Sequence, residues 1–137
     1  MKSIKKTVFI ILIFLFSGFL YSQNALKDSL NQYPVNMTVA EFNKRISNQN
    51  KLVLVAFSAD WCVMCKKQKP ILDEIKSEKK GVLEFIDIDM EENPLIAEHF
   101  NVDGLPINLI YKKGNLVWDR VGFKTKSELL KQISIFE

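Results

Sequence analysis

The only two cysteines of this 137-residue chain, Cys62 and Cys65, lie three positions apart. The apolar run Leu52–Phe57 precedes them and a charged stretch that favours a helix follows, so we expect them where a buried strand turns into a helix. Backbone N–H groups and the helix dipole stabilise a thiolate at such a point. Two thiols one helical turn apart can also close into a disulfide. The spacing therefore predicts a reversible two-electron redox centre, with the Cys62–Cys65 disulfide itself in place of a cofactor.

The first 22 residues have the pattern of a secretory signal peptide. Three lysines form a basic beginning, residues 7–21 are almost wholly apolar, and Ser22 offers a small residue for cleavage. As a helix, the apolar run would span about 22 Å, short of the roughly 30 Å hydrocarbon core. A retained N-terminal anchor is the alternative, because Leu20 is a poor match to the small residue expected near the cut. We therefore expect a periplasmic or otherwise exported protein.

The charge balance changes once the signal peptide is removed. The whole sequence carries 19 Lys and Arg against 16 Asp and Glu, and the excess lies in the three lysines of the signal. The sequence has no basic stripe interleaved with aromatic residues, so we expect no nucleic-acid partner. In an oxidising compartment a cysteine pair is usually a structural disulfide. Such bridges stabilise mainly by closing long loops, and a four-residue loop constrains very little, which favours the redox interpretation.

The remaining sequence predicts a linker at residues 23–37 and one domain at residues 38–137. Capping-box patterns at Thr38 and Thr125 each predict the start of a helix. Because a helix connects the first two strands, these strands should be parallel. The expected elements are a helix after Thr38, a strand at 51–57, a helix from the cysteines to about Lys79 that continues with a kink through Pro70, a strand at 82–89, a short helix capped by Asn93 and ending near Phe100, strands at 107–111 and 116–121 joined by a hairpin turn, and a last helix after Thr125.

This order, with its motifs, resembles the thioredoxin family. Phe57–Lys66 resembles the family's active-site segment, Val102–Pro106 the segment that carries its cis-proline, and Lys113–Gly122 its final hairpin. The resemblance covers residues 38–136 and implies an α/β thioredoxin fold, a four-stranded mixed sheet flanked by helices on both faces. Within it, Ala59–Lys66 is similar to the C-terminal periplasmic domain of DsbD-type thiol reductases, which favours a periplasmic role.

The resemblance also implies a role for each site residue. Cys62, at the exposed start of the helix, would attack a substrate disulfide, and the more buried Cys65 would resolve the mixed disulfide. Leu105 and Pro106 would bind a substrate segment as an added strand, and Trp61 would shield one side of the site.

Three departures from thioredoxin itself affect this expectation. Val63 and Met64 stand between the cysteines where thioredoxins have Gly-Pro, and Ile107 replaces the threonine after the proline, which makes the substrate groove more apolar. Ala56 replaces a buried aspartate that helps to deprotonate the resolving cysteine, and Phe85 replaces the lysine that faces it. We therefore expect Asp60 or Glu84 to take the proton of Cys65 through water.

These observations predict an exported, monomeric thiol–disulfide oxidoreductase. We expect it to reduce disulfides of exported proteins and to receive electrons from a membrane thiol reductase. A disulfide oxidase or isomerase is the alternative within this class. Two thiolates at this spacing also suit Cu(I), so a copper-binding protein of the same fold is a second alternative, and a binding domain with a vestigial redox pair is a third. The only histidine, His99, is expected on the surface at a helix end, and we expect no other metal site.

Overall fold

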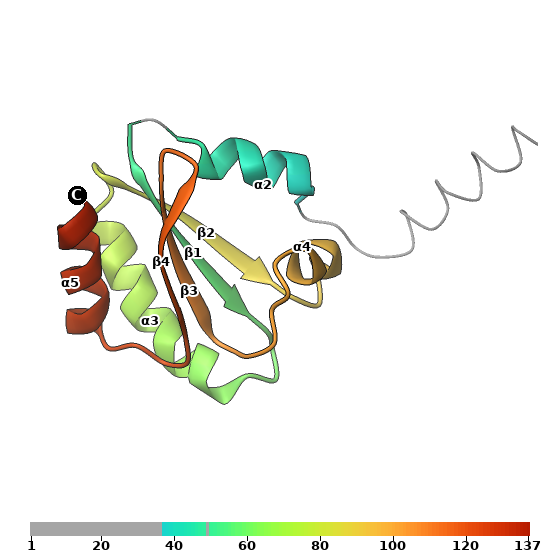
Figure 1. Ribbon diagram of the computed structural model, residues 1–137. Helices are drawn as coiled ribbons and strands as arrows, with labels where there is room; N and C mark the ends of the chain where they lie inside the picture. The colour runs from blue at the N-terminus through green and yellow to red at the C-terminus, as the bar shows by residue number, and fades with distance from the viewer. Residues whose placement is uncertain (1–36, 49) are drawn as a thin grey trace, which may run out of the picture. The chain divides into compact units, whose positions relative to one another are not determined.

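The structure, a computed structural model, describes residues 37–48 and 50–137 (Figure 1). The predicted order of helices and strands is confirmed in this part of the chain. The elements are α2 (Val39–Ile46), β1 (Leu52–Ser58), α3 (Val63–Glu78), β2 (Leu83–Asp89), α4 (Pro94–His99), β3 (Ile107–Lys112), β4 (Asn115–Val121) and α5 (Lys126–Phe136). The predicted signal peptide at residues 1–22 lies outside the described residues, as does nearly all of the linker. No helix among the described residues is long and apolar enough to cross a membrane.

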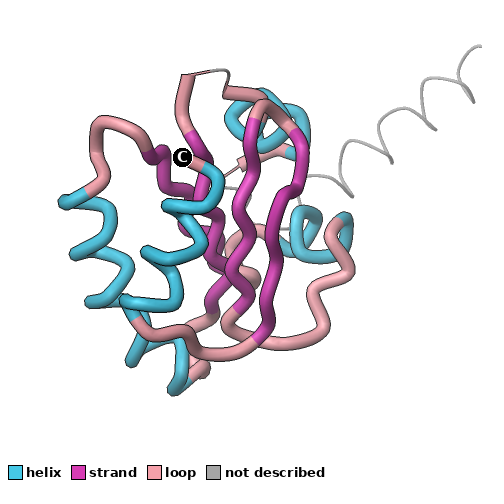
Figure 2. Tube along the Cα trace, turned by 60° about the vertical axis from the view of Figure 1, so that its left-hand side comes forward, coloured by secondary structure: helices cyan, strands magenta, loops and turns pink. Residues whose placement is uncertain are grey.

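The four strands form one mixed sheet in the order β2-β1-β3-β4. β1 runs parallel to β2 and antiparallel to β3, and β4 pairs antiparallel with β3. Helices α3 and α5 cover one face of the sheet, and α2 and α4 cover the other (Figures 1 and 2). The α/β thioredoxin fold with helices on both faces is therefore confirmed.

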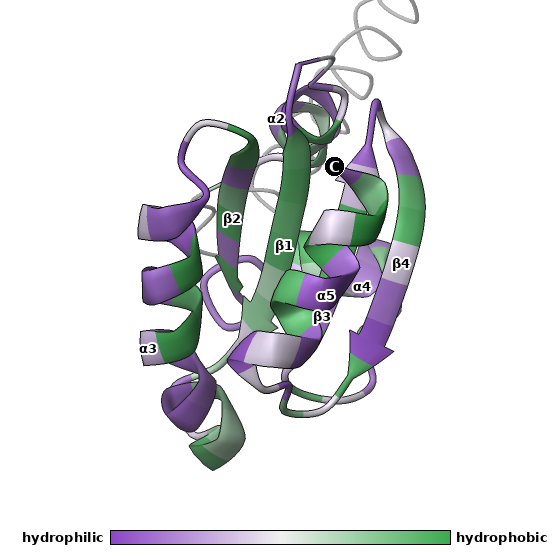
Figure 3. Ribbon diagram, turned by 90° about the vertical axis from the view of Figure 1, so that its left-hand side faces the viewer, coloured by the Kyte–Doolittle hydropathy of each residue, from purple (hydrophilic) through white to green (hydrophobic). Residues whose placement is uncertain are grey.

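β1 is the central strand of the apolar core. Every residue from Leu52 to Phe57 is buried, as the consecutive apolar positions predict for a strand covered on both faces. Figure 3 shows β1 apolar along its length, whereas β2 alternates between apolar and polar residues. The odd-numbered β1 residues 53–57 pack with Phe42 of α2 and Ile96 of α4, and the even-numbered ones pack with Ile75 of α3 and Ile133 of α5.

The sequence patterns at the helix starts have different outcomes. At α5 the capping box is complete: the Thr125 hydroxyl accepts from the Glu128 N–H, and the Glu128 carboxylate accepts from the Thr125 N–H. At α2 only the Thr38 side chain caps, accepting from the Glu41 N–H at 3.1 Å. Asn93 was expected to cap α4, and this prediction is wrong. Its side chain accepts from the Met37 N–H and donates to the Asp89 carbonyl instead, so it ties the start of the domain to the end of β2.

The two threonine caps give a matched pair of variants. We expect Thr125→Ala to lower the free energy of unfolding by about 1 kcal/mol, the usual cost of losing an N-cap. Thr38→Ala should cost less, because its cap makes one of the two reciprocal hydrogen bonds. Urea unfolding of both variants beside the wild type measures the difference. A larger loss in Thr38→Ala would contradict this assignment.

Candidate active site

Cys62 and Cys65 form a disulfide at the point where β1 gives way to α3. Their Cα atoms are 5.2 Å apart. Cys62 is the N-cap residue of α3, with extended backbone angles, and its Sγ accepts a hydrogen bond from the Cys65 N–H at 3.1 Å. Cys65 lies inside the first turn. As predicted, α3 continues through Pro70 to Glu78. The helix thus directs a backbone donor at the sulfur of Cys62, where it would stabilise a thiolate.

The expected difference in exposure between the two cysteines is wrong. Cys62 is 6% exposed and Cys65 is 7% exposed, so both are buried in the disulfide form. The reason is packing: Ala59 and Leu105 lie against both cysteines. What distinguishes the two sulfurs is their position relative to the helix. Only the sulfur of Cys62 lies at a helix end and accepts a backbone N–H.

The residues expected to bind substrate surround the disulfide. The Leu105–Pro106 peptide bond is cis, and Leu105 packs against the cysteines. The ladder between β1 and β3 ends at the pair Phe57–Ile107, so the backbone of Leu105 lies beyond it. Trp61 is 68% exposed, so it is not a core residue. With the exposed side chains of Val63 and Met64, it forms an apolar rim on the helix side of the disulfide.

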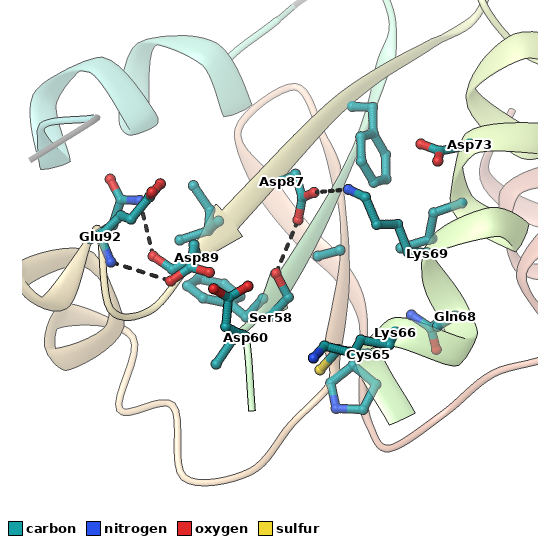
Figure 4. A pocket seen from close by; sticks show the side chains of 18 of the residues that line it. Ser58, Asp60, Cys65, Lys66, Gln68, Lys69, Asp73, Asp87, Asp89 and Glu92 are labelled. Carbon is teal, nitrogen blue, oxygen red and sulfur yellow. Dashed lines mark hydrogen bonds and ion pairs between the residues drawn. The ribbon is translucent and has the colours of Figure 1, made fainter. Parts of the chain in front are cut away.

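A cleft of about 300 Å³ opens beside Cys65, between α3 and β2 (Figure 4). Its floor includes Ala56 and Ser58 of β1, whose small side chains leave space beneath the helix. Pro106 also lines it. The ionisable side chains on its walls are Asp60, Lys66, Lys69, Asp73, Asp87, Asp89 and Glu92. The cleft therefore connects the buried Cys65 with charged groups at the surface.

Glu84 cannot serve Cys65 as expected, because it lies on the other face of the sheet. Its register partner is Val53, which belongs to the core on the α2 and α4 side. There the Glu84 carboxylate accepts from Arg45 Nε at 2.9 Å and from Asn48 Nδ2 at 2.9 Å. The alternation of strand residues decides this, because Glu84 and Phe85 point to opposite faces.

The ion pair of Glu84 makes stability depend on pH. Burial alone would raise the pKa of Glu84, but the hydrogen bonds from Asn48 and Arg45 and the charge of Arg45 lower it overall. An unfolded glutamate titrates near about 4.3, so this contribution is present above that pH and is lost as the pH falls through the lower folded value. We expect Glu84→Gln to be less stable than the wild type at neutral pH, with the gap closing in acid.

Urea unfolding across this pH range tests the effect of Glu84. Arg45→Met removes the partner and should give the same pH dependence, and the double variant should add little to either single change. A gap between wild type and Glu84→Gln that stays constant down to about pH 3 would contradict the linkage.

The sequence gave no reason to select Gln68 and Asn108, which form a buried pair behind Cys65. Gln68 Nε2 donates to Asn108 Oδ1 at 2.7 Å, and Gln68 Oε1 accepts from the Lys124 N–H at 2.7 Å. Gln68 lies one turn after Cys65 on α3, and Asn108 lies two residues after Pro106. An asparagine inside the apolar strand sequence Ile107–Tyr111 was the signal that could have identified it. The pair joins three segments around the disulfide.

The described residues contain no group of three or more His, Cys, Asp or Glu side chains placed to hold a metal ion. His99 is exposed at the end of α4, where its ring lies edge-on to that of Phe100. His99 is not among the residues that line the cleft beside Cys65. The structure thus brings together Trp61, Cys62, Cys65, Leu105 and Pro106 and leaves the histidine elsewhere.

Comparison with known proteins agrees with this geometry. The sequence profile of the thioredoxin family matches residues 33–135. The thioredoxin of Mycobacterium tuberculosis H37Rv is 36% identical over 109 residues, which make up 80% of this chain and 94% of that protein. The thioredoxin of Pseudomonas aeruginosa PAO1 is 32% identical over 100 residues, 73% of this chain and 93% of that protein.

Among solved structures, one similar chain comes from work on the thiol-resolving mechanism of yeast mitochondrial 1-Cys peroxiredoxin through glutathione and thioredoxin systems. It superposes with a TM-score of 0.66 at 26% identity and covers 77% of this chain and 96% of its own length. A Cys-x-x-Cys disulfide at a helix start, on this fold, defines a protein-disulfide oxidoreductase. The chain belongs to the thioredoxin family.

Proposed function

We propose that this protein is an exported thiol–disulfide oxidoreductase that reduces disulfides of other exported proteins. The observation that carries the proposal is the hydrogen bond from the Cys65 N–H to Cys62 Sγ at the start of α3. In the reduced protein this donor and the helix dipole favour the thiolate of Cys62 over its thiol. The thiolate is the form that attacks disulfides.

The reaction proceeds through a mixed disulfide. Cys62 Sγ attacks one sulfur of the substrate disulfide, and the other substrate sulfur leaves as a thiolate. Cys65 Sγ then attacks Cys62 Sγ, the bond from Cys62 to the substrate breaks, and the second substrate sulfur leaves. The substrate gains two electrons and the Cys62–Cys65 pair loses them, so no cofactor takes part. Leu105 and Pro106 would hold the substrate segment beside Cys62, and Trp61 would cover the apolar side of the site.

Location and partners follow from the first 22 residues, whose pattern is that of a signal peptide. A reductase outside the cytoplasm must be re-reduced there, so the proposal includes a membrane thiol reductase as electron donor. Its substrates would be exported proteins that carry disulfides, and it would act as a monomer.

One measurement tests the direction of electron flow. The reduction potential of the Cys62–Cys65 pair against glutathione should be near about −270 mV, the value of thioredoxin, rather than about −120 mV, the value of the oxidant DsbA. Reduction of insulin disulfides by the same preparation should accompany it. A potential near the higher value would support the oxidase or isomerase alternative. Tight Cu(I) binding without any thiol exchange would overturn the oxidoreductase proposal.

A further inference from the structure

The proton of Cys65 needs an acceptor, and this inference, which rests on the proposed function, identifies it. Only a thiolate can resolve the mixed disulfide. A free cysteine thiol has a pKa of about 8.5, so at neutral pH it mostly retains its proton unless a base removes it. Ala56 offers no base beneath Cys65, and Glu84 lies on the other face of the sheet. The acceptor must therefore be found elsewhere on the cleft wall.

Three residues lie side by side across the sheet on the face covered by α3. Ala56 of β1 is the register partner of Asp87 in β2 and of Asn108 in β3. Register partners point to the same face of a sheet. Cys65, Ala56 and Asp87 also line the same cleft. The single methyl group of Ala56 therefore leaves room for water between Cys65 and Asp87.

Other charged groups on the cleft wall are less suited to accept this proton. Asp89 Oδ1 accepts the N–H groups of Glu91 and Glu92 and so closes a turn. The Asp60 carboxylate points away from Cys65, toward Asp89 (Figure 4). Asp73 lies eight positions after Cys65 on the same helix, about 12 Å along its axis. The charged side chains around Cys65 and Asp87 are Lys66, Lys69 and Asp73 from α3, Asp60 from the loop before it, Asp89 from β2 and Glu92 from the turn after β2.

Asp87 is both positioned and hydrated. Ser58 Oγ donates to its Oδ1 at 3.4 Å, and Lys69 Nζ donates to its Oδ2 at 3.4 Å (Figure 4). Ser58 is in β1 and Lys69 is in α3, so these two contacts hold the carboxylate across the cleft mouth. The side chain is 43% exposed, so water reaches it. A carboxylate in this position can accept a proton delivered by water from inside the cleft.

The third residue of the row supplies a site for that water. Asn108 is 0% exposed, and its Oδ1 accepts from Gln68, but its Nδ2 has no hydrogen-bond partner among the described residues. Buried polar groups of this kind are generally satisfied by an ordered water. A water in the space beside Ala56 would meet this need and would lie between Cys65 and Asp87.

We propose that a water beside Ala56, held by Asn108 Nδ2, passes the proton of Cys65 to the Asp87 carboxylate as Cys65 attacks the mixed disulfide. The S–H bond of Cys65 breaks, the water takes that proton and gives one of its own to Asp87. The electron pair left on Cys65 Sγ forms the bond to Cys62 Sγ. The bond between Cys62 and the substrate breaks, and the substrate leaves as a thiolate.

Reduced protein mixed with the aromatic disulfide dithiobis-nitrobenzoate tests this route. Attack by Cys62 releases one coloured thiolate at a rate that depends on reagent concentration, and attack by Cys65 releases the second at a rate that does not. We expect Asp87→Asn to leave the first phase unchanged and to slow the second about tenfold below about pH 7, less than the hundredfold or more typical of a directly positioned base. The difference should close above the thiol pKa, where hydroxide removes the proton.

Two further variants separate proton transfer from structure. Asp87→Glu keeps the carboxylate and should restore most of the second phase, whereas Asp73→Asn makes the same charge change in the same cleft and should leave both phases as in the wild type. Slowing of Asp87→Asn by the same factor at every pH, or no slowing, overturns the inference. If the wild type releases no thiolate and reduces no insulin, the proposed function fails instead.

Discussion

Cys62→Ser is expected to abolish disulfide reduction, and Cys65→Ser is expected to trap its first intermediate. Without the sulfur of Cys62 no mixed disulfide forms at the helix start, so insulin reduction should fall by more than about a thousandfold, the scale of losing a covalent nucleophile. Cys65→Ser keeps the nucleophile and its backbone donor, since that donor is the N–H of residue 65. It should therefore react once and remain bound to its substrate.

Mass spectrometry of each variant after incubation with a disulfide-bonded protein measures this asymmetry. The Cys65→Ser protein should gain the mass of the substrate, and dithiothreitol should release it. The Cys62→Ser protein should gain little, because Cys65 is 7% exposed and accepts no helix-end N–H at its sulfur. Equal trapping by both variants would contradict the proposed division of roles.

Phe42→Ala is expected to have the largest effect on stability, about 4 kcal/mol, within the usual range for removing a buried phenylalanine. Phe42 is 0% exposed and joins α2 to the rest of its core. Its ring centroid lies 4.8 Å from that of Phe100 and 6.2 Å from that of Tyr111. Removal leaves a cavity among rings held by three different elements, which cannot all move to fill it.

Urea unfolding of Phe42→Ala measures this loss. Phe123→Ala is the matched control, because Phe123 is 36% exposed and truncation there should cost less than about 1 kcal/mol. A loss below about 2 kcal/mol in Phe42→Ala would show that the core relaxes around the gap.

Most of the fold follows from local patterns in the sequence. The consecutive apolar residues of β1 predict a strand buried on both faces, and the helix between β1 and β2 predicts their parallel pairing. The redox pair is equally local, because three positions along one turn bring Cys62 and Cys65 together. These features depend on neighbours in the sequence and so are accessible without a structure.

Features that depend on pairing between distant strands were harder to predict. Glu84 and Asp87 differ by three positions, so they point to opposite faces of β2, and only the register with β1 decides which of them faces the active-site helix. The equal burial of the two cysteines likewise arises from Leu105, forty positions after Cys65. For Gln68 and Asn108, residue type alone gives no sign that one completes the other.

The hydrogen bond from the Met37 N–H to Asn93 has a practical consequence for handling this protein. Met37 and Asn93 both line the cleft beside Cys65, so the chain enters the domain at the edge of the sheet that carries the disulfide. The last residue, Glu137, pairs with Lys79 at the other end of α3. A fluorophore or surface tether attached at the carboxyl end is thus kept clear of incoming substrates, whereas one placed just before Met37 is delivered to their path.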